Sequence, residues 1–139
     1  MPVTLDEARN MIEGALARAK ALGIRVAVIV VDEGGLPIAS ARMDGTLPWA
    51  LQVAEAKAVG SALWHRDGDY IAKVAQERPT DFQQLNALPV LRGLPLIPAL
   101  GALLIRSGEH VLGAVAVSGG RADKDKECAQ AALDVLGAR

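Results

Sequence analysis

The sequence predicts an α+β domain of three layers, α/β/α, in which helices cover both faces of an antiparallel sheet. Two pairs of apolar segments, 24–31 with 36–42 and 100–105 with 111–117, are each joined by a short turn. Such short connections cannot hold a crossover helix, so the strands of each pair are antiparallel neighbours. The first segment is apolar without alternation from residue 26 to residue 31. Both of its faces therefore need covering by helices.

The first element is predicted to be a helix that begins after Thr4 and ends at Gly23. Thr4 and Glu7 have the spacing of a capping box, in which each side chain bonds the backbone of the other residue. Glycine is the residue that most often ends a helix, in the left-handed conformation. Apolar residues recur at helical spacing between these two points, so one face of the helix should pack on the sheet.

The middle of the chain is predicted to be mostly helical. Residues 44–46 (Asp-Gly-Thr) break the second strand, and Pro48 suits the first turn of a helix that reaches about Trp64. A short helix is expected over 70–76. Four prolines punctuate 78–98, so we expect short helical pieces and a wrapping loop there.

The chain is predicted to end in a helix over 122–136. Asp123 and Asp125 lie in its first turn, where negative charge suits the helix dipole. Ser118, Gly119 and a second glycine precede it, so free backbone amides there could bind an anion. A strand-to-helix turn that needs positive φ explains the glycines equally well.

Composition restricts the classes of protein to which the chain can belong. Its 139 residues suit one domain over 1–139 with a core of its own. The net charge is −1 and the basic residues are scattered, which argues against a nucleic-acid or anionic-membrane partner. The sequence shows neither a basic-then-apolar leader nor an apolar run long enough for a membrane span, so a cytoplasmic protein is expected. A single cysteine cannot form an internal disulfide.

Five segments together resemble the GlcG/HbpS-like family of haem-degrading or haem-binding domains, which also occurs at the C-terminus of PduO-type proteins. They are V-D-E-G-G at 31–35, A-R-M-D-G at 41–45, A-E-A-K-A at 54–58, V-L-G-A-V-A-V-S-G-G at 111–120 and D-K-E-C-A-Q-A-A-L at 125–133. The resemblance implies a profilin-like fold, with a five-stranded antiparallel sheet and helices on both faces. It also implies assembly into homo-oligomers, dimers or larger rings.

The resemblance implies haem as a cofactor, but the sequence departs from the family at two points. Members commonly carry Gly-Gly-Val-Pro-Ile before the last hairpin, where this chain has Gly-Ala-Leu-Leu-Ile at 101–105. Some haem-binding members use a histidine of the N-terminal helix, whereas the histidines here are His65 and His110. His110 is predicted to lie in a hairpin turn and His65 at a helix end, both in contact with solvent. A zinc site needs three or four ligands, so no metal site is predicted.

Lys57 is the most informative single candidate. On a helix, Ala50, Ala54, Lys57 and Ser61 share one face, so the lysine lies where the helix approaches another element closely. It could bind a ligand carboxylate, or act as a catalytic base or nucleophile whose pKa is lowered by desolvation. The alternatives are a side chain that reaches solvent or one that pairs with Asp44.

The Arg-Met-Asp-Gly corner is predicted to face Lys57 and to form a pocket with it. Arg42 could hold a carboxylate with two hydrogen bonds, and Asp44 could act as a catalytic base or orient Lys57. Gly45 would let the backbone approach the ligand. A structural ion pair within a turn is the alternative interpretation.

These residues support three hypotheses about function. The first is a small-ligand-binding protein that takes haem or a carboxylate-bearing molecule in a pocket near Arg42, Asp44, Lys57 and the loop at Ser118. The second is a small catabolic enzyme, an isomerase, tautomerase or lyase, that acts on a carboxylate or an oxidised ring compound by proton transfer. The third is a non-catalytic oligomeric partner subunit.

Overall fold

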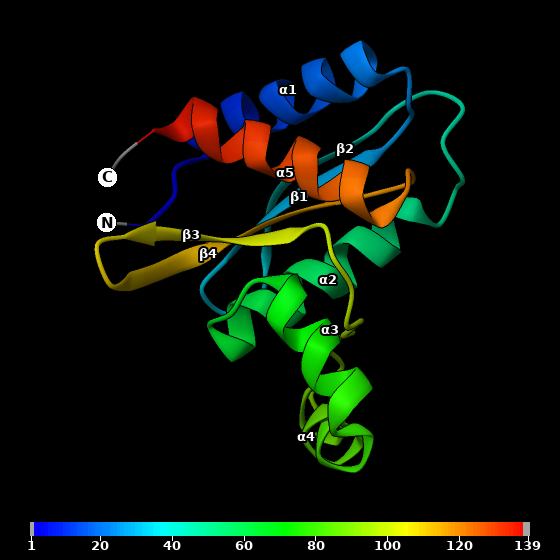
Figure 1. Ribbon diagram of the computed structural model, residues 1–139. Coiled ribbons are helices and arrows are strands. Elements are labelled where there is room, and N and C mark those ends of the chain that lie inside the picture. Colours follow the sequence, from blue (N-terminus) through cyan, green and yellow to red (C-terminus); the bar gives the residue numbers. More distant parts are fainter. Residues whose placement is uncertain (1, 138–139) are drawn as a thin grey trace.

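The computed structural model describes residues 2–137 and shows an antiparallel sheet with helices packed on both faces (Figure 1). The strand order is β2-β1-β4-β3, so the two predicted hairpins meet through their inner strands. The elements in chain order are α1 Leu5–Leu22, β1 Ala27–Asp32, β2 Pro37–Arg42, α2 Ala50–Trp64, α3 Gly68–Glu77, α4 Pro79–Leu91, β3 Ala102–Ser107, β4 His110–Ser118 and α5 Ala122–Leu136.

The expectation of five strands is wrong for the part of the chain that the structure describes, where the sheet has four. The sequence itself has only four extended apolar segments, and each of them forms one strand. The long connection between the two hairpins folds into α2, α3 and α4 instead. Pro79 stands in the first turn of α4, where a missing amide hydrogen costs nothing.

The capping box and the glycine stop of α1 are confirmed. Glu7 donates its amide to Thr4 Oγ1 at 3.1 Å, and Thr4 donates its amide to Glu7 Oε1 at 2.9 Å. Gly23 has a φ of 70° and ends the helix. Ile24 still donates its amide to Ala19 in the helix, which explains why β1 begins three residues later than predicted.

Helices α1 and α5 cover one face of the sheet and α2 covers the other (Figure 1). The α1/α5 side buries larger residues, such as Val28, Val117 and Met11. The α2 side is built mostly from alanines, among them Ala54 and Ala58. Small residues let a helix approach a sheet closely, so polar residues of α2 are brought against the strands as well.

Helices α3 and α4 extend beyond the sheet as an arm (Figure 1). A small cluster of Ile71, Phe82 and Leu96 holds the arm together, and the rings of Trp64 and Phe82 lie 6.0 Å apart. The segment 78–98 was predicted to contain short helical pieces and a loop. It forms one helix with Pro89 in its last turns, followed by an irregular segment that leads to β3.

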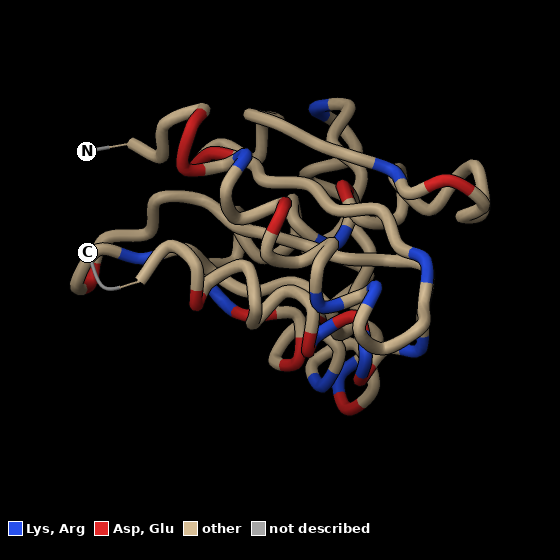
Figure 2. Tube along the Cα trace, turned by 90° about the horizontal axis from the view of Figure 1, so that it is seen from above, with Lys and Arg blue, Asp and Glu red and all other residues tan. Residues whose placement is uncertain are grey.

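Lysine and arginine positions are interspersed with aspartate and glutamate positions along the trace (Figure 2). Between residues 2 and 137, no helix is both long and apolar enough to cross a lipid bilayer.

Candidate functional site

The sheet register brings two of the predicted site residues to the same end of the sheet. Ala27 pairs with Arg42 on one side and with Ser118 on the other. Directly paired residues project to the same face, and Val28 packs on the α1/α5 side. Arg42 and Ser118 therefore flank Ala27 on the face that α2 covers.

The Asp44-Gly45 corner and the loop after β4 adjoin each other through Arg25. A Cβ on Gly119 would lie 2.6 Å from the Arg25 carbonyl oxygen and 3.3 Å from the Thr46 methyl group. Arg25 also donates from Nη1 to the carbonyl of Asp44 at 3.4 Å, and its guanidinium occupies the space beside Gly45. Gly45 and Gly119 have φ of 81° and 124°, so both positions favour glycine. The sequence reasoning did not identify Arg25.

Lys57 is buried and its partner is Asp125 of α5. Its Nζ lies 3.4 Å from Asp125 Oδ2 and donates to the Val117 carbonyl at 3.1 Å. The side chains of Lys57 and Asp125 are only 7% and 3% exposed. The other carboxylate oxygen, Oδ1, accepts the amide of Gly120 at 2.9 Å. One of the amides expected to be free for an anion is thus already bonded to a carboxylate of the chain itself.

Burial disfavours the charged form of both members of this pair. It lowers the pKa of Lys57, and Asp125 acts in the opposite direction. It raises the pKa of Asp125, while the Lys57 charge and the Gly120 amide counteract the rise. The pKa of Lys57 is therefore shifted in the direction expected of a catalytic base or nucleophile, although its nitrogen is hydrogen-bonded.

Gly101 has no side chain, and this leaves the space in which Lys57 of α2 reaches Asp125 of α5. A Cβ at this position would lie 2.7 Å from the Val117 oxygen and 3.1 Å from Lys57 Nζ. Its φ of 112° also favours glycine. Because Lys57 belongs to α2 and Asp125 to α5, the ion pair connects the layers on opposite faces of the sheet at its end.

The corner residues do not converge on Lys57 as predicted. Arg42 is exposed and donates from Nη1 to the Pro48 carbonyl at 2.9 Å. Asp44 is also exposed. Within the described range, no hydrogen bond or ion pair joins Lys57 to Arg42 or Asp44. The Arg42 guanidinium thus faces solvent, where it could bind a carboxylate.

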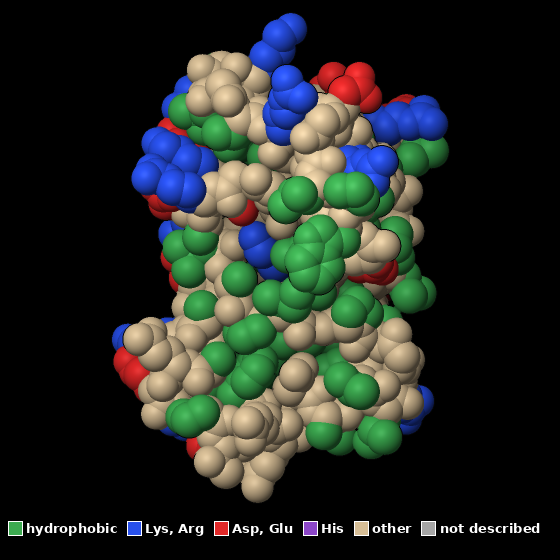
Figure 3. Space-filling view, turned by 90° about the vertical axis from the view of Figure 1, so that its right-hand side faces the viewer, with side chains coloured by type: hydrophobic (Ala, Val, Ile, Leu, Met, Phe, Trp, Pro, Cys, Tyr) green, Lys and Arg blue, Asp and Glu red, His purple; other side chains and the backbone are tan. Residues whose placement is uncertain are grey.

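Two exposed apolar residues lie next to the proline that Arg42 binds. Leu47 and Trp49 are 64% and 67% exposed, and they flank the proline whose carbonyl Arg42 binds. Figure 3 views the molecule from the side on which this loop lies in Figure 1, and hydrophobic side chains gather over the middle of the view with basic ones around them. The surface combines apolar area with positive charge.

Two histidines, a cysteine and a serine differ in how far they are exposed to solvent. His65 and His110 are exposed, and His65 ends α2 with a φ of 55°. Burial raises the pKa of the Cys128 thiol to about 11, so the cysteine behaves as an apolar core residue. The Ser61 hydroxyl is buried one turn after Lys57 and lacks a hydrogen-bond partner among the described residues.

A sequence model described as haem degrading protein HbpS-like matches residues 3–134. The chain belongs to the HbpS-like family. A similar protein of Citrobacter freundii, named for its place in the dhaT-dhaS intergenic region, is 27% identical over 132 residues, covering 95% of this chain and 90% of that protein. That relative is itself uncharacterised.

Solved structures of other proteins share the fold. Klebsiella pneumoniae ORFY is 29% identical with a TM-score of 0.85, covering 99% of this chain and 92% of ORFY. A double mutant of Streptomyces reticuli HbpS is 26% identical with a TM-score of 0.85, covering 99% and 88%. PduOC, solved in complex with haem, is 20% identical with a TM-score of 0.86, covering 99% and 96%, and shows likeness of fold alone.

Proposed function

We propose that this HbpS-like protein binds a small molecule with an apolar body and a carboxylate, with haem as the first candidate, at the end of the sheet beside α2. The observation that carries the proposal is the exposed Arg42 guanidinium, which is oriented by the Pro48 carbonyl between Leu47 and Trp49. A guanidinium offers two parallel donors to a carboxylate, and the neighbouring apolar surface suits the rest of the ligand. The family model that matches the chain, described as haem degrading protein HbpS-like, supports haem as the first candidate.

The proposed contacts come from Arg42, Gly45, Ser118 and Gly119. Gly45 and Gly119 pack against Arg25 next to this face, and Ser118 is the residue that pairs with Ala27 on the side opposite Arg42. Lys57 supplies the buried charge behind this surface, where it is balanced by Asp125.

These residues fit the acid groups of haem better than its iron. Arg42 could hold a propionate, since haem carries two carboxylates. His110 lies at the opposite end of β4 from Ser118, and His65 is the C-terminal cap residue of α2. We therefore propose that haem, where it binds here, is held through its propionates and apolar faces.

A haem titration followed at the Soret band tests this proposal. The unmodified protein should shift the band at micromolar haem, and Arg42→Gln should weaken binding by roughly tenfold, the worth of one charge-assisted hydrogen bond. Arg106→Gln removes an exposed arginine of β3 and serves as the matched control. His65→Ala and His110→Ala should leave the band unchanged. The absence of any shift would eliminate haem, and equal affinities of the Arg42 and Arg106 variants would eliminate Arg42.

The lowered pKa of Lys57 favours a second candidate, a small catabolic isomerase, tautomerase or lyase. In this proposal Lys57 or Asp44 removes a proton from the carbon next to the ketone of a keto acid, and the electron pair is held as the enol. Deuterium exchange at C3 of pyruvate and 2-oxobutyrate, the carbon next to the ketone, tests it directly when it is followed by NMR. Exchange should be faster with the protein than without it and should fall in Lys57→Arg and Asp44→Asn. Unchanged exchange in both variants would exclude both residues from the chemistry.

Assembly into dimers or larger rings also stays a prediction, which light scattering coupled to gel filtration tests. A monomer at micromolar concentration would contradict it.

A further inference from the structure

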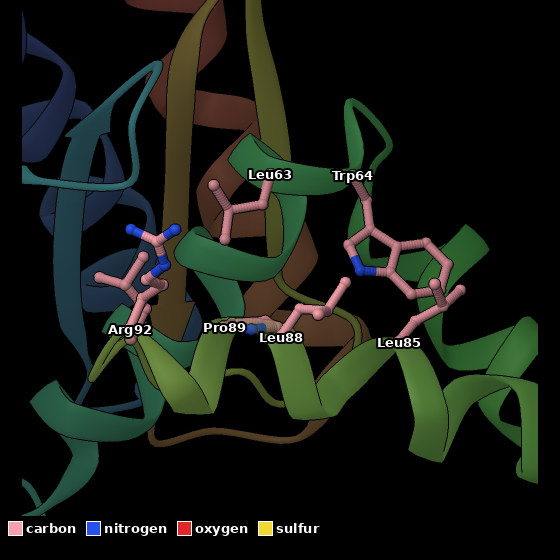
Figure 4. Close-up of a pocket in the computed structure, with 7 residues that line it drawn as sticks. Leu63, Trp64, Leu85, Leu88, Pro89 and Arg92 are labelled. Carbon is pink, nitrogen blue, oxygen red and sulfur yellow. The ribbon is translucent and has the colours of Figure 1, made fainter.

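A pocket lies away from the sheet end, between the C-terminal part of α2 and α4. Its volume is about 440 Å³, within the range of roughly 300–1,000 Å³ that small-molecule sites occupy. Figure 4 shows α2 side chains above and α4 side chains below the opening, with Arg92 at one end and Trp64 at the other. Its principal lining residues are Leu63, Trp64, Leu85, Leu88, Pro89 and Arg92. We call it the α2–α4 pocket.

The walls of this pocket are held in place from behind. Trp64 and Phe82 pack with their rings 6.0 Å apart, and Phe82 is anchored in the small core of the arm. Leu85 and Leu88, by contrast, are 47% and 61% exposed. The inner face of α4 is therefore fixed by packing, while its outer leucines flank the opening. A ligand would meet this apolar surface without any rearrangement of the helix.

One charge is placed at the edge of this apolar surface. Among the residues that the structure describes, Arg92 is the only charged one that lines the pocket. Its guanidinium has no hydrogen bond or ion pair within the described range, whereas Arg18 and Arg78 each have an acidic partner. An arginine without a partner beside an apolar wall selects for a ligand with an anionic head and an apolar body.

We propose that the α2–α4 pocket binds a monocarboxylic acid with an apolar chain or ring, its body against Trp64 and Leu88 and its carboxylate on Arg92. This site is distinct from the sheet end, because Lys57 lies near the middle of α2 whereas Leu63 and Trp64 are its last two residues. The proposal goes beyond the function given above and does not depend on it.

The fluorescence of Trp64 reports directly on occupancy. The chain has two tryptophans, so Trp49→Phe leaves Trp64 as the single tryptophan. We expect decanoate, below its micellar concentration, to change this emission saturably. Decan-1-ol has the same apolar chain but no charge, and should bind roughly tenfold more weakly.

Two substitutions in this background separate the charge from the apolar wall. Arg92→Gln should weaken decanoate binding about tenfold and leave decan-1-ol unchanged, whereas Arg106→Gln, the matched control, should affect neither. Leu88→Asn should weaken both ligands, and its side chain is exposed enough for the variant to fold. Circular dichroism of each variant checks the fold.

Several outcomes would overturn the proposal. They are the absence of a saturable signal, equal binding of decanoate and decan-1-ol, and an Arg92→Gln variant that binds decanoate normally. If Leu88→Asn instead dissociates an oligomer while decanoate never binds, the pocket is an interface between copies of this chain. Arg42→Gln must leave decanoate binding intact, because its loss would mean a single site at the sheet end. The haem titration of Arg92→Gln separates failure of this proposal from failure of the first.

Discussion

Breaking the Lys57–Asp125 pair at one side should destabilise the protein strongly, whereas replacing both members should cost much less. The variants are Lys57→Met, Asp125→Asn and the two combined. Asparagine keeps an oxygen that can accept the Gly120 amide, which now bonds Asp125 at 2.9 Å. Methionine keeps most of the length of lysine without its charge.

The magnitude follows from the geometry of the pair. At 3.4 Å and an effective dielectric constant of about 20, two unit charges attract by about 5 kcal/mol. Burial of each ion costs several kcal/mol, so the net contribution of the intact pair is small. Removing one partner leaves the other charge buried and uncompensated, which should lower the free energy of unfolding by about 3–5 kcal/mol. The double variant buries no charge and should be more stable than either single variant.

Urea unfolding followed by far-UV circular dichroism measures these free energies. Arg18→Met with Glu127→Gln is the matched control, since this ion pair also joins α5 to another helix but is exposed to water. Its two substitutions should have little effect and should be additive. The reasoning would be refuted if the Lys57 and Asp125 substitutions were also additive, or if each cost less than about 1 kcal/mol.

The remaining predictions concern pH, the thiol and one glycine. The fold raises the pKa of Asp125, so the wild type should lose stability relative to the double variant as pH rises from about 4 through the Asp125 pKa. The fold lowers the pKa of Lys57, so the wild type should regain this stability as pH rises further towards 10.5. A difference in the free energy of urea unfolding that does not change with pH would contradict this. Cys128, with a pKa of about 11, should react with a disulfide reagent at pH 8 only after unfolding, and rapid labelling of the native protein would contradict its burial. Gly101→Ala should destabilise the protein by several kcal/mol more than Gly108→Ala. Both positions have positive φ, but only an alanine at 101 would place its Cβ against neighbouring atoms. Equal thermal midpoints of the two variants would contradict this.

Local rules predicted most of the fold. The capping box fixed the start of α1, and the two short apolar hairpins gave the four strands and their antiparallel pairing. The fifth strand came from the family resemblance and has no counterpart in the apolar segments of this chain. The register between the two hairpins could not be read from the sequence, because it depends on which strands pack side by side.

The site was predicted in part. Position on α2 marked Lys57 as a residue brought close to another element, and it is buried. Its partner was missed, since Asp125 was interpreted only as a first-turn acid of the last helix. The sequence signal that could have pointed to it is Gly101, which the family motif retains and which leaves room for both Lys57 and Asp125. Sequence separation of 68 residues hid the contact.

The buried pair changes how the A-E-A-K-A motif should be interpreted. Lysine has three donor hydrogens, and two acceptors, Val117 and Asp125, are already in place. A ligand carboxylate could reach this nitrogen only by competing with a carboxylate that the fold holds in place. An exposed arginine meets no such competition, so recognition of an acid at the surface should depend on Arg42 more than on Lys57. Arg42→Gln should weaken ligand binding without loss of stability, which would assign ligand binding to the arginine. Lys57→Met should weaken binding no more than its loss of stability explains, which would assign to the lysine of this motif the role of joining the helix layers.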